Sequence, residues 1–345
     1  MTLLRRTDRG LYCEAGDFYV DPWAGVDRAV VTHAHGDHVA WGCRAYLTAA
    51  PGESVLRQRL EPGARVRSLP YAEAIDVNGV RVSLHPAGHI LGSAQVRLEH
   101  RGEVWVVSGD YKTEPDPTCD SWEPVTCHTF VTECTFGLPV YRWPAPSAVV
   151  DEIHAWWRAN QEAGRASLLF GYALGKAQRL IAGLDPSVGP ILTHGAVERL
   201  NRLYREAGVA LPPTTHAAVS DRTVWPRAIV IAPPMADGSP WALRFGEQST
   251  AFASGWMAIR GMRRRSAVDR GFTVSDHVDW PSLLAAIDAT GAERIWATHG
   301  YTGVLVRWLR EHGRNADAIE TRYEGEGDDA DQAGAGAKEE TLPAP

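Results

Sequence analysis

The sequence predicts a layered α/β (α+β) protein that is larger than one minimal domain. Three observations support this. Short β-segments dominate the first 110 residues, strands alternate with helices from about residue 147, and apolar residues make up 44% of the 345 residues against 22% charged residues. Such a composition is usual for packed globular proteins, so wholesale disorder, coiled-coil and collagen classes are excluded. The length suffices for two domains or for one domain with a large insertion.

The amino-terminal part reads as short strands separated by turns, because apolar and β-branched residues come in brief runs bounded by turn-forming residues. The expected strands cover residues 17–20, 29–32, 80–85, 94–99 and 103–108. Helical periodicity is weak in this part of the sequence. The first 110 residues therefore supply sheet more than helix.

Helical periodicity begins after Pro144 and Pro146. Ser147 can cap a helix over residues 147–163, with acidic side chains in its early turns, where the helix dipole favours them. Strands are then expected at 167–170, 190–193, 271–274 and 294–298, and helices at 174–184, 196–207, 280–289 and 302–312. This alternation predicts parallel sheet with helices on its faces.

Targeting signals and cysteine pairs are not apparent in the sequence. The first six residues have no apolar segment behind their positive charges, and no run of about 18 apolar residues occurs. We therefore expect a soluble, cytoplasmic protein with no membrane partner. The five cysteines form no C-x-x-C pair, which argues against a disulfide framework and against a cysteine zinc site.

The net charge of −7 is concentrated at the carboxyl end. Residues 321–345 hold seven acidic and two basic residues, so they contribute −5 of that total, and we expect this acidic tail to be disordered. The rest of the chain is nearly neutral. An anionic polymer needs only a local basic strip, and the densest candidate is the arginine-rich run 260–265.

The strongest chemical motif is the run T-H-A-H-G-D-H at residues 32–38, directly after an apolar strand. His33 and His35 can present nitrogens to one cation, while Asp37 and His38 turn to a second. Nitrogen and oxygen ligands of this kind favour zinc, with manganese or iron as alternatives. The competing interpretation is a polar loop with accidental histidines.

This run resembles the H-x-H-x-D-H signature of the metallo-β-lactamase superfamily. Asp21 ends an early strand, where the superfamily keeps a carboxylate that supports the metal loop. His89 and Asp110 each follow a strand and match a further ligand and the bridging carboxylate; taken singly, each could be an ordinary turn residue. The resemblance implies one ion held by His33, His35, His89 and Asp110 and a second held by Asp37, His38, Asp110 and His299.

The second half resembles the β-CASP nucleases within that superfamily. Glu133 matches the acid of their first motif, His277 in S-D-H matches the second, and His299 in T-H-G matches the third. The run A-L-G-K-A-Q at 173–178 resembles a stretch of their inserted domain. The runs S-G-W-M at 254–257 and W-A-T-H-G-Y-T at 296–302 further resemble the bacterial ligase-associated DNA exonuclease family.

This resemblance implies a metallo-β-lactamase αββα sandwich with an inserted β-CASP α/β domain. The sandwich would take residues 1–142 and 259–320, the inserted domain residues 143–258, and the acidic tail residues 321–345. The activity implied is that of a zinc- or manganese-dependent exonuclease. It would hydrolyse DNA phosphodiester bonds with a hydroxide activated by two metal ions, in DNA repair or end processing beside an ATP-dependent DNA ligase and a helicase.

The same resemblance assigns roles to single residues. His277, oriented by Glu133, would be the general acid, with Asp37 in the catalytic set; the competing interpretation of His277 is a core histidine paired to a carboxylate. The weaker candidates for substrate contact are Lys176, Ser254, Arg260 and Arg264.

Three other functions stay open from the sequence. A histidine at position 299 is typical of RNA-acting relatives, so an RNA-processing β-CASP ribonuclease is the main alternative. A small-molecule metallo-hydrolase would have no use for the long insertion between Glu133 and His277. An inactive nucleic-acid-binding scaffold would not need all seven ligand positions filled by competent side chains.

Overall fold

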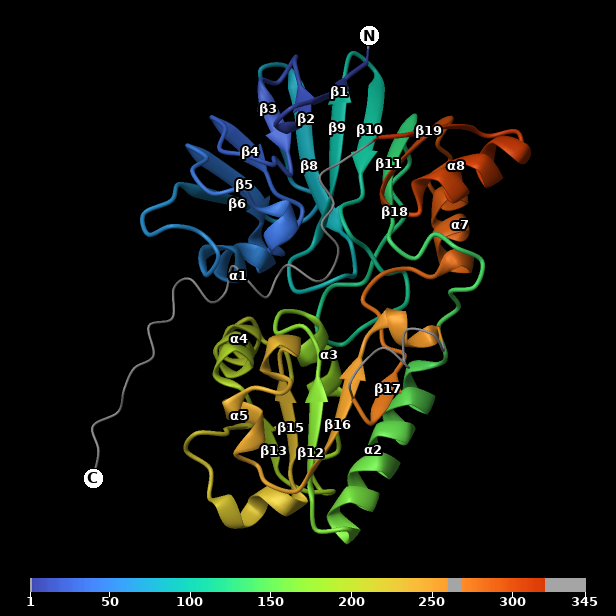
Figure 1. Cartoon of the computed structure of the whole chain (residues 1–345). Coiled ribbons are helices and arrows are strands. Elements are labelled where there is room, and N and C mark those ends of the chain that lie inside the picture. Colours follow the sequence, from blue (N-terminus) through green and yellow to red (C-terminus); the bar gives the residue numbers. More distant parts are fainter. Residues whose placement is uncertain (1, 260–267, 320–345) are drawn as a thin grey trace.

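The computed structural model describes residues 2–259 and 268–319, which form three β-sheets with flanking helices (Figure 1). The first sheet has six strands in sequence order. Strands β1 to β3 pair antiparallel, and β3 to β6 pair parallel. The strands are β1 (Leu4–Thr7), β2 (Gly10–Cys13), β3 (Phe18–Val20), β4 (Arg28–Val30), β5 (Ala45–Ala49) and β6 (Val66–Leu69).

The second sheet joins segments from both ends of the chain in the order β19-β18-β11-β10-β9-β8-β7. Its strands are β7 (Ala74–Val77), β8 (Val80–Pro86), β9 (Ala94–His100), β10 (Glu103–Val107), β11 (Thr129–Cys134), β18 (Arg294–Gly300) and β19 (Asn315–Ala318). β7 to β10 pair antiparallel, whereas β10, β11, β18 and β19 run parallel. The carboxyl ends of β8, β10, β11 and β18 therefore lie at one edge.

A shared apolar core joins these two sheets, in which Val20 and Val30 of the first sheet pack with Val82, Val96 and Val107 of the second. Helices cover the outer faces. Helices α7 (Trp280–Ala289) and α8 (Thr302–Glu311) pack on the seven-stranded sheet. Helix α1 (Glu53–Arg57) packs on the first six-stranded sheet.

The third sheet comes from one continuous part of the chain, between β11 and β18. Its strands pair parallel throughout, in the order β14-β13-β15-β12-β16-β17. They are β12 (Ala166–Phe170), β13 (Ile191–Thr193), β14 (Thr215–His216), β15 (Ile229–Ala232), β16 (Gln248–Ala253) and β17 (Arg270–Phe272). In Figure 1 this unit lies below the first two sheets, and α3 and α4 lie on the side that faces them.

The helices of this unit are α2 (Pro146–Glu162), α3 (Lys176–Ala182), α4 (Gly195–Glu206) and α5 (Pro240–Leu243). Short 3-10 turns complete the described elements. They are η1 (Gly36–His38), η2 (Ala50–Gly52), η3 (Arg222–Arg227), η4 (Pro234–Ala236) and η5 (Gly255–Ala258). Within the described ranges, no helix combines the length and the apolar character needed to cross a bilayer.

The predicted α/β class is confirmed, and the predicted helices lie close to their observed bounds; α7 agrees at both ends. Several strands were missed. β15 is an example, because all four of its residues are buried and it therefore lacks an alternating pattern. β17 extends the third sheet past the boundary expected at residue 258. The expected disordered tail, 321–345, lies outside the described residues.

Candidate metal centre and catalytic pair

Strand ends bring the predicted ligands to one place. The loop after β4 carries His33 and His35 and then η1, which carries Asp37 and His38. The loops after β8 and β10 carry two further predicted ligands, and a third lies in the last residues of β18. These are His89, Asp110 and His299, respectively. Two groups of ligand atoms result, and they share the carboxylate of Asp110.

In the first group, three imidazole nitrogens meet beside that carboxylate. Nδ1 of His35 lies 3.1 Å from Nε2 of His33 and 3.0 Å from Nε2 of His89. Oδ2 of Asp110 lies 3.6 Å from His33 Nε2 and 3.8 Å from His89 Nε2. All four side chains are buried. Ligands of one tetrahedral zinc ion stand about 3.3 Å apart for bonds of about 2.0 Å, so this spacing fits one divalent ion.

The other ring nitrogens of these histidines are held by the surrounding chain. The backbone oxygen of Leu174 lies 3.2 Å from His35 Nε2, and that of Asp276 lies 2.9 Å from His89 Nδ1. A carbonyl oxygen only accepts, so each of these ring nitrogens carries the proton and donates it. The opposite nitrogens, which face the cluster, then keep their lone pairs. This is the arrangement that orients metal-binding histidines.

The electrostatics of the first group also favour neutral imidazoles. Burial, followed by the charge of His38, holds the pKa of His33 well below its usual value. Burial and then His277 lower the pKa of His89 in the same direction. Both rings are therefore neutral at pH 7, which is the form that binds a metal ion.

The second group consists of His38, Asp110 and His299. Nδ1 of His38 lies 2.7 Å from Oδ2 of Asp21, and its Nε2 lies 3.5 Å from Oδ2 of Asp110. That Nε2 atom is buried and has no hydrogen-bond partner of normal geometry within the described part of the chain. A buried polar atom without a partner is costly, so this nitrogen fits a position that a metal ion would satisfy.

Asp37 lies beside this group but not within it. Its Oδ2 atom is 3.7 Å from His38 Nε2, and its side chain is 28% exposed. Burial alone would lower the pKa of His38, but the carboxylates of Asp110, Asp37 and Asp21 outweigh burial and raise the pKa well above its usual value. The position attracts positive charge, so we expect a metal ion to compete with this proton.

Asp110 is placed by a backbone that only glycine permits. Gly109 has φ +56°, and a β-carbon there would lie 2.6 Å from the β-carbon of Thr32. Burial alone would raise the pKa of Asp110, but the positive charges of His38 and then His277 hold it well below its usual value. The carboxylate therefore stays ionised, as a ligand shared by two cations must be.

His299 reaches the second group through a left-handed backbone, with φ +52°. Such a conformation costs a non-glycine residue about 1–3 kcal/mol and is concentrated at functional sites. Gly300 follows with φ +84°, and a β-carbon there would lie 2.3 Å from the backbone oxygen of Cys134. The turn brings the His299 ring to 5.1 Å from the ring of His38, centroid to centroid.

A third cluster pairs His277 with Glu133. Nδ1 of His277 lies 2.9 Å from each carboxylate oxygen of Glu133 and 4.0 Å from Asp110 Oδ2. Glu133 is fully buried and also accepts hydrogen bonds from the backbone nitrogen of Tyr111 and from the hydroxyl of Thr135. The carboxylate thus fixes the ring of His277 at the border of the metal-binding groups.

These observations test whether a metal ion fits. The nitrogen and carboxylate ligands, the neutral imidazoles and the unsatisfied His38 Nε2 all fit divalent zinc or manganese. The first group would hold one ion and the second group another. The third cluster shares Asp110 but places Glu133 against His277, as a hydrogen-bonded carboxylate–imidazole pair.

The weaker substrate candidates are distributed differently. Ser254 is buried, and its hydroxyl caps η5 by accepting from the backbone nitrogen of Trp256 at 3.3 Å. Lys176 begins α3, and its fully buried side chain pairs with Asp276; its contact with substrate stays a prediction. Arg260 and Arg264 lie outside the described residues.

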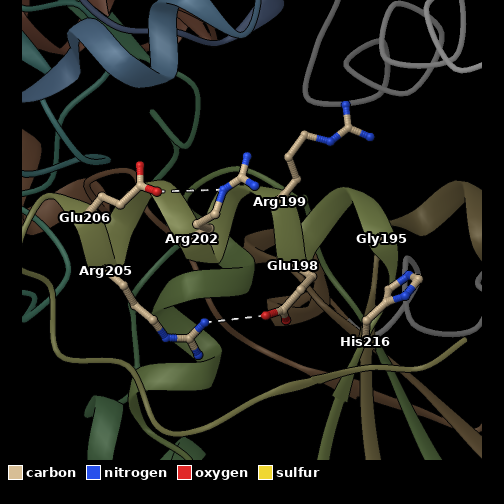
Figure 2. A pocket seen from close by; sticks show the side chains of 7 residues that line it. All are labelled: Gly195, Glu198, Arg199, Arg202, Arg205, Glu206 and His216. Carbon is tan, nitrogen blue, oxygen red and sulfur yellow. Dashed lines mark hydrogen bonds and ion pairs between the residues drawn. The ribbon is translucent and has the colours of Figure 1, made fainter. Parts of the chain in front are cut away.

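A pocket on the third-sheet unit lies apart from these groups (Figure 2). It follows the outer face of α4, where Arg202 pairs with Glu206 at 3.8 Å and Arg205 pairs with Glu198 at 3.5 Å. Gly195, Arg199 and His216 complete its lining. None of the predicted ligands lines this pocket.

Sequence reasoning gave no role to Asp276 or to the backbone of Leu174, although both hold ligand histidines. Asp276 stands beside His277 in the S-D-H motif, and this adjacency was a usable signal. No sequence signal could have identified the Leu174 oxygen, because every residue type has a backbone carbonyl.

Known proteins resemble the chain over different lengths. It is 32% identical over 313 residues to a protein of Opitutus terrae described as a probable DNA ligase, a match over 90% of this chain and 30% of that protein. It is 31% identical over 125 residues to the endoribonuclease YSH1 of Saccharomyces cerevisiae, over 35% of this chain and 16% of that protein. It is 29% identical over 137 residues to cleavage and polyadenylation specificity factor subunit 3 of Dictyostelium discoideum, over 39% and 17%, respectively. No family model matches the chain.

The chain spans 30% or less of the length of these relatives. The chain is thus similar to a probable DNA ligase and to two proteins of RNA processing, and its structure contains a buried His/Asp cluster.

Proposed function

We propose that this protein is a metal-dependent DNA exonuclease that hydrolyses phosphodiester bonds in DNA repair or end processing. The observation that carries the proposal is the meeting of three elements at Asp110: the imidazole cluster, the second ligand group and the His277–Glu133 pair. A phosphodiesterase needs ligands for cations, a group that handles a proton and access for a polyanion. Side chains suited to the first two needs lie within a few ångströms of one another.

Metal ions bound by the two ligand groups would supply Lewis-acid stabilisation of the phosphate and a water of lowered pKa. The chain itself would handle the other proton. Glu133 accepts from Nδ1 of His277, which leaves Nε2 as the nitrogen that gives a proton to the departing sugar oxygen. Glu133 also fixes the ring, so His277 needs no reorientation during the reaction.

Two facts support DNA as the substrate. Similarity to the probable DNA ligase runs over 90% of this chain, whereas similarity to endoribonuclease YSH1 covers 35% of it. The S-G-W-M run at 254–257 and the run 296–302 also resemble the ligase-associated exonucleases. An ATP-dependent DNA ligase and a helicase are the partners proposed on this basis.

The main rival is an RNA-processing nuclease, favoured by His299 at the third motif and by the similarity to YSH1. One experiment separates the two. Matched DNA and RNA strands, labelled separately at each terminus, are incubated with the protein and zinc or manganese. We expect DNA to be shortened progressively from one end. Preferential RNA cleavage, or internal cuts only, would contradict the proposal.

The same assay addresses the other two alternatives. A nucleic-acid-binding scaffold would retard the strands on a gel and leave them intact. A small-molecule hydrolase would do neither and would cleave thioester or lactam substrates instead. Metal analysis of the purified protein completes the test, because a scaffold has no need of bound divalent ions.

A further inference from the structure

A buried ion pair links the third-sheet unit to the segment that carries His277. Lys176 is the first residue of α3, and its Nζ lies 3.1 Å from Oδ1 of Asp276; the two side chains are 0% and 2% exposed. The ammonium also lies 4.7 Å from the ring centroid of Tyr172. Burying a charge is costly unless it is closely paired, so this contact fixes the two segments against each other.

Asp276 stands between a predicted metal ligand and the predicted general acid. Its backbone oxygen accepts from Nδ1 of His89, and His277 is the next residue. One ligand atom each from Asp276, His89 and His277 falls within a single 4.8 Å cluster. The Lys176 ammonium is the positive partner of this carboxylate. Burial alone would raise the pKa of Asp276, but Lys176 and then His89 hold it well below its usual value.

The residues next to Lys176 reach the same ligand loops. The oxygen of Leu174 accepts from His35 Nε2. Arg179, one turn along α3, donates to the backbone oxygen of Ser275 at 3.3 Å and to that of His89 at 3.5 Å. Residues 174–179 therefore contact the metal-binding part at several points. Their charged contacts include Arg179–Asp116, at 2.9 Å, and Lys176–Asp276, which is the more deeply buried of the two.

We propose that Lys176 is a positioning residue of the metal centre, and that its ion pair with Asp276 holds His89 and His277 in their working orientation. The third-sheet unit is then a structural part of the metal centre as well as a neighbour of it. This inference rests on the metal-dependent function proposed above.

The test uses the full chain and removes both charges together. The Lys176→Met/Asp276→Asn double variant keeps side chains of similar size and leaves no unpaired buried charge, so the fold is expected to persist. The matched control is Arg205→Met, which also removes a cation of the third-sheet unit. Arg205 pairs with Glu198 and donates to Pro212 and Thr214, away from the ligand groups.

Zinc affinity is measured by competition with a chelator, and the cobalt-substituted protein is compared by visible absorption. We expect zinc affinity to fall about 10- to 100-fold in the double variant, as for other groups that orient metal ligands. The cobalt spectrum should change, and kcat should fall more than KM rises. The Arg205→Met protein should behave as the wild type does.

Wild-type zinc affinity and an unchanged cobalt spectrum in a folded double variant would overturn the inference. Should that variant not fold, hydrogen exchange on the wild-type protein decides. Zinc should then protect the amides of residues 174–179 as well as those of the ligand loops, and the absence of added protection at 174–179 would overturn it. If the wild type binds zinc and cleaves nucleic acid while the double variant equals it, this inference alone fails. If the wild type binds no divalent ion, the proposed function fails with it.

Discussion

The two ligand groups that meet at Asp110 are held in different ways. In the first, all four side chains are buried, and backbone oxygens orient His35 and His89. In the second, Asp21 orients His38, and His299, whose side chain is 12% exposed, sits on a left-handed backbone at the end of β18. Asp37, which is 28% exposed, lies beside this group. The first group is thus preformed, and the second is more accessible.

This difference predicts that the two groups differ in metal affinity and in their distance from the substrate. A rigid, buried set of neutral imidazoles favours tight metal binding, because little reorganisation is needed when the ion enters. A partly exposed set leaves room for a phosphate oxygen and a water. We therefore expect the first group to bind its ion more tightly and the second to lie nearer the bound substrate.

The largest effect should come from Asp110, which both groups share. Asp110→Asn removes the charge that balances two cations, so we expect loss of bound metal from both groups. Cleavage should fall about 10⁴-fold, equivalent to about 5 kcal/mol. Metal analysis and nuclease assay check this, with Asp185→Asn, an exposed carboxylate, as the control. Retention of two ions would show that Asp110 does not bridge the groups.

Next in size is His277, which should belong to neither group. His277→Ala removes the proton donor, so cleavage should fall about 10²- to 10⁴-fold while bound metal stays unchanged. His312→Ala, on the surface, is the matched control. Loss of metal together with activity would reassign His277 as a ligand and merge the third cluster with the first group.

A pair of variants compares the two groups directly. His89→Ala should weaken the tighter site, whereas His299→Ala should weaken only the looser one, each by at least the roughly 10- to 100-fold in affinity that loss of an orienting group costs. Stepwise titration with zinc followed by calorimetry resolves the two sites. Loss of the tighter ion in His299→Ala, or loss of the same ion in both variants, would contradict the assignment of two separate sites.

The smallest effect concerns His194, which caps α4 in the third-sheet unit and belongs to neither group. Burial and then His216 lower the pKa of His194 from 6.5 to about 4. Because the folded-state pKa lies below the unfolded value, stability is full above about pH 6.5 and is lost as the pH falls toward 4. The loss should be about 1 kcal/mol after allowance for solvent screening. Urea unfolding at pH 7 and pH 5 measures it, and His194→Gln should reduce the difference between the two pH values.

The parts of the site that depend on residues close together in the chain could be predicted from the sequence. The T-H-A-H-G-D-H run and the positions of His89 and Asp110 after strands predicted which residues would meet. The groups that orient these residues could not be predicted in this way, because they lie far away along the chain. The oxygen that orients His35 comes from Leu174, and the oxygen that orients His89 comes from Asp276.

The surroundings of Lys176 were hidden for the same reason. Lys176 begins α3, but no local sequence signal indicated that this end of α3 packs against the ligand loops. A β-carbon at Gly175 would lie 2.2 Å from a side-chain methyl group of Ile90, so the glycine serves close packing. Similarly, β15 lacks alternation because both of its faces are covered.

The place of His299 along the polypeptide has a consequence for synthesis. Every other predicted ligand lies within the first 110 residues, but this last one follows the whole third-sheet unit. During translation the second group can close only after β18 leaves the ribosome and pairs with β11. The first group also waits for later residues, because the oxygens that orient His35 and His89 belong to Leu174 and Asp276. Both groups would therefore take their final form late in synthesis.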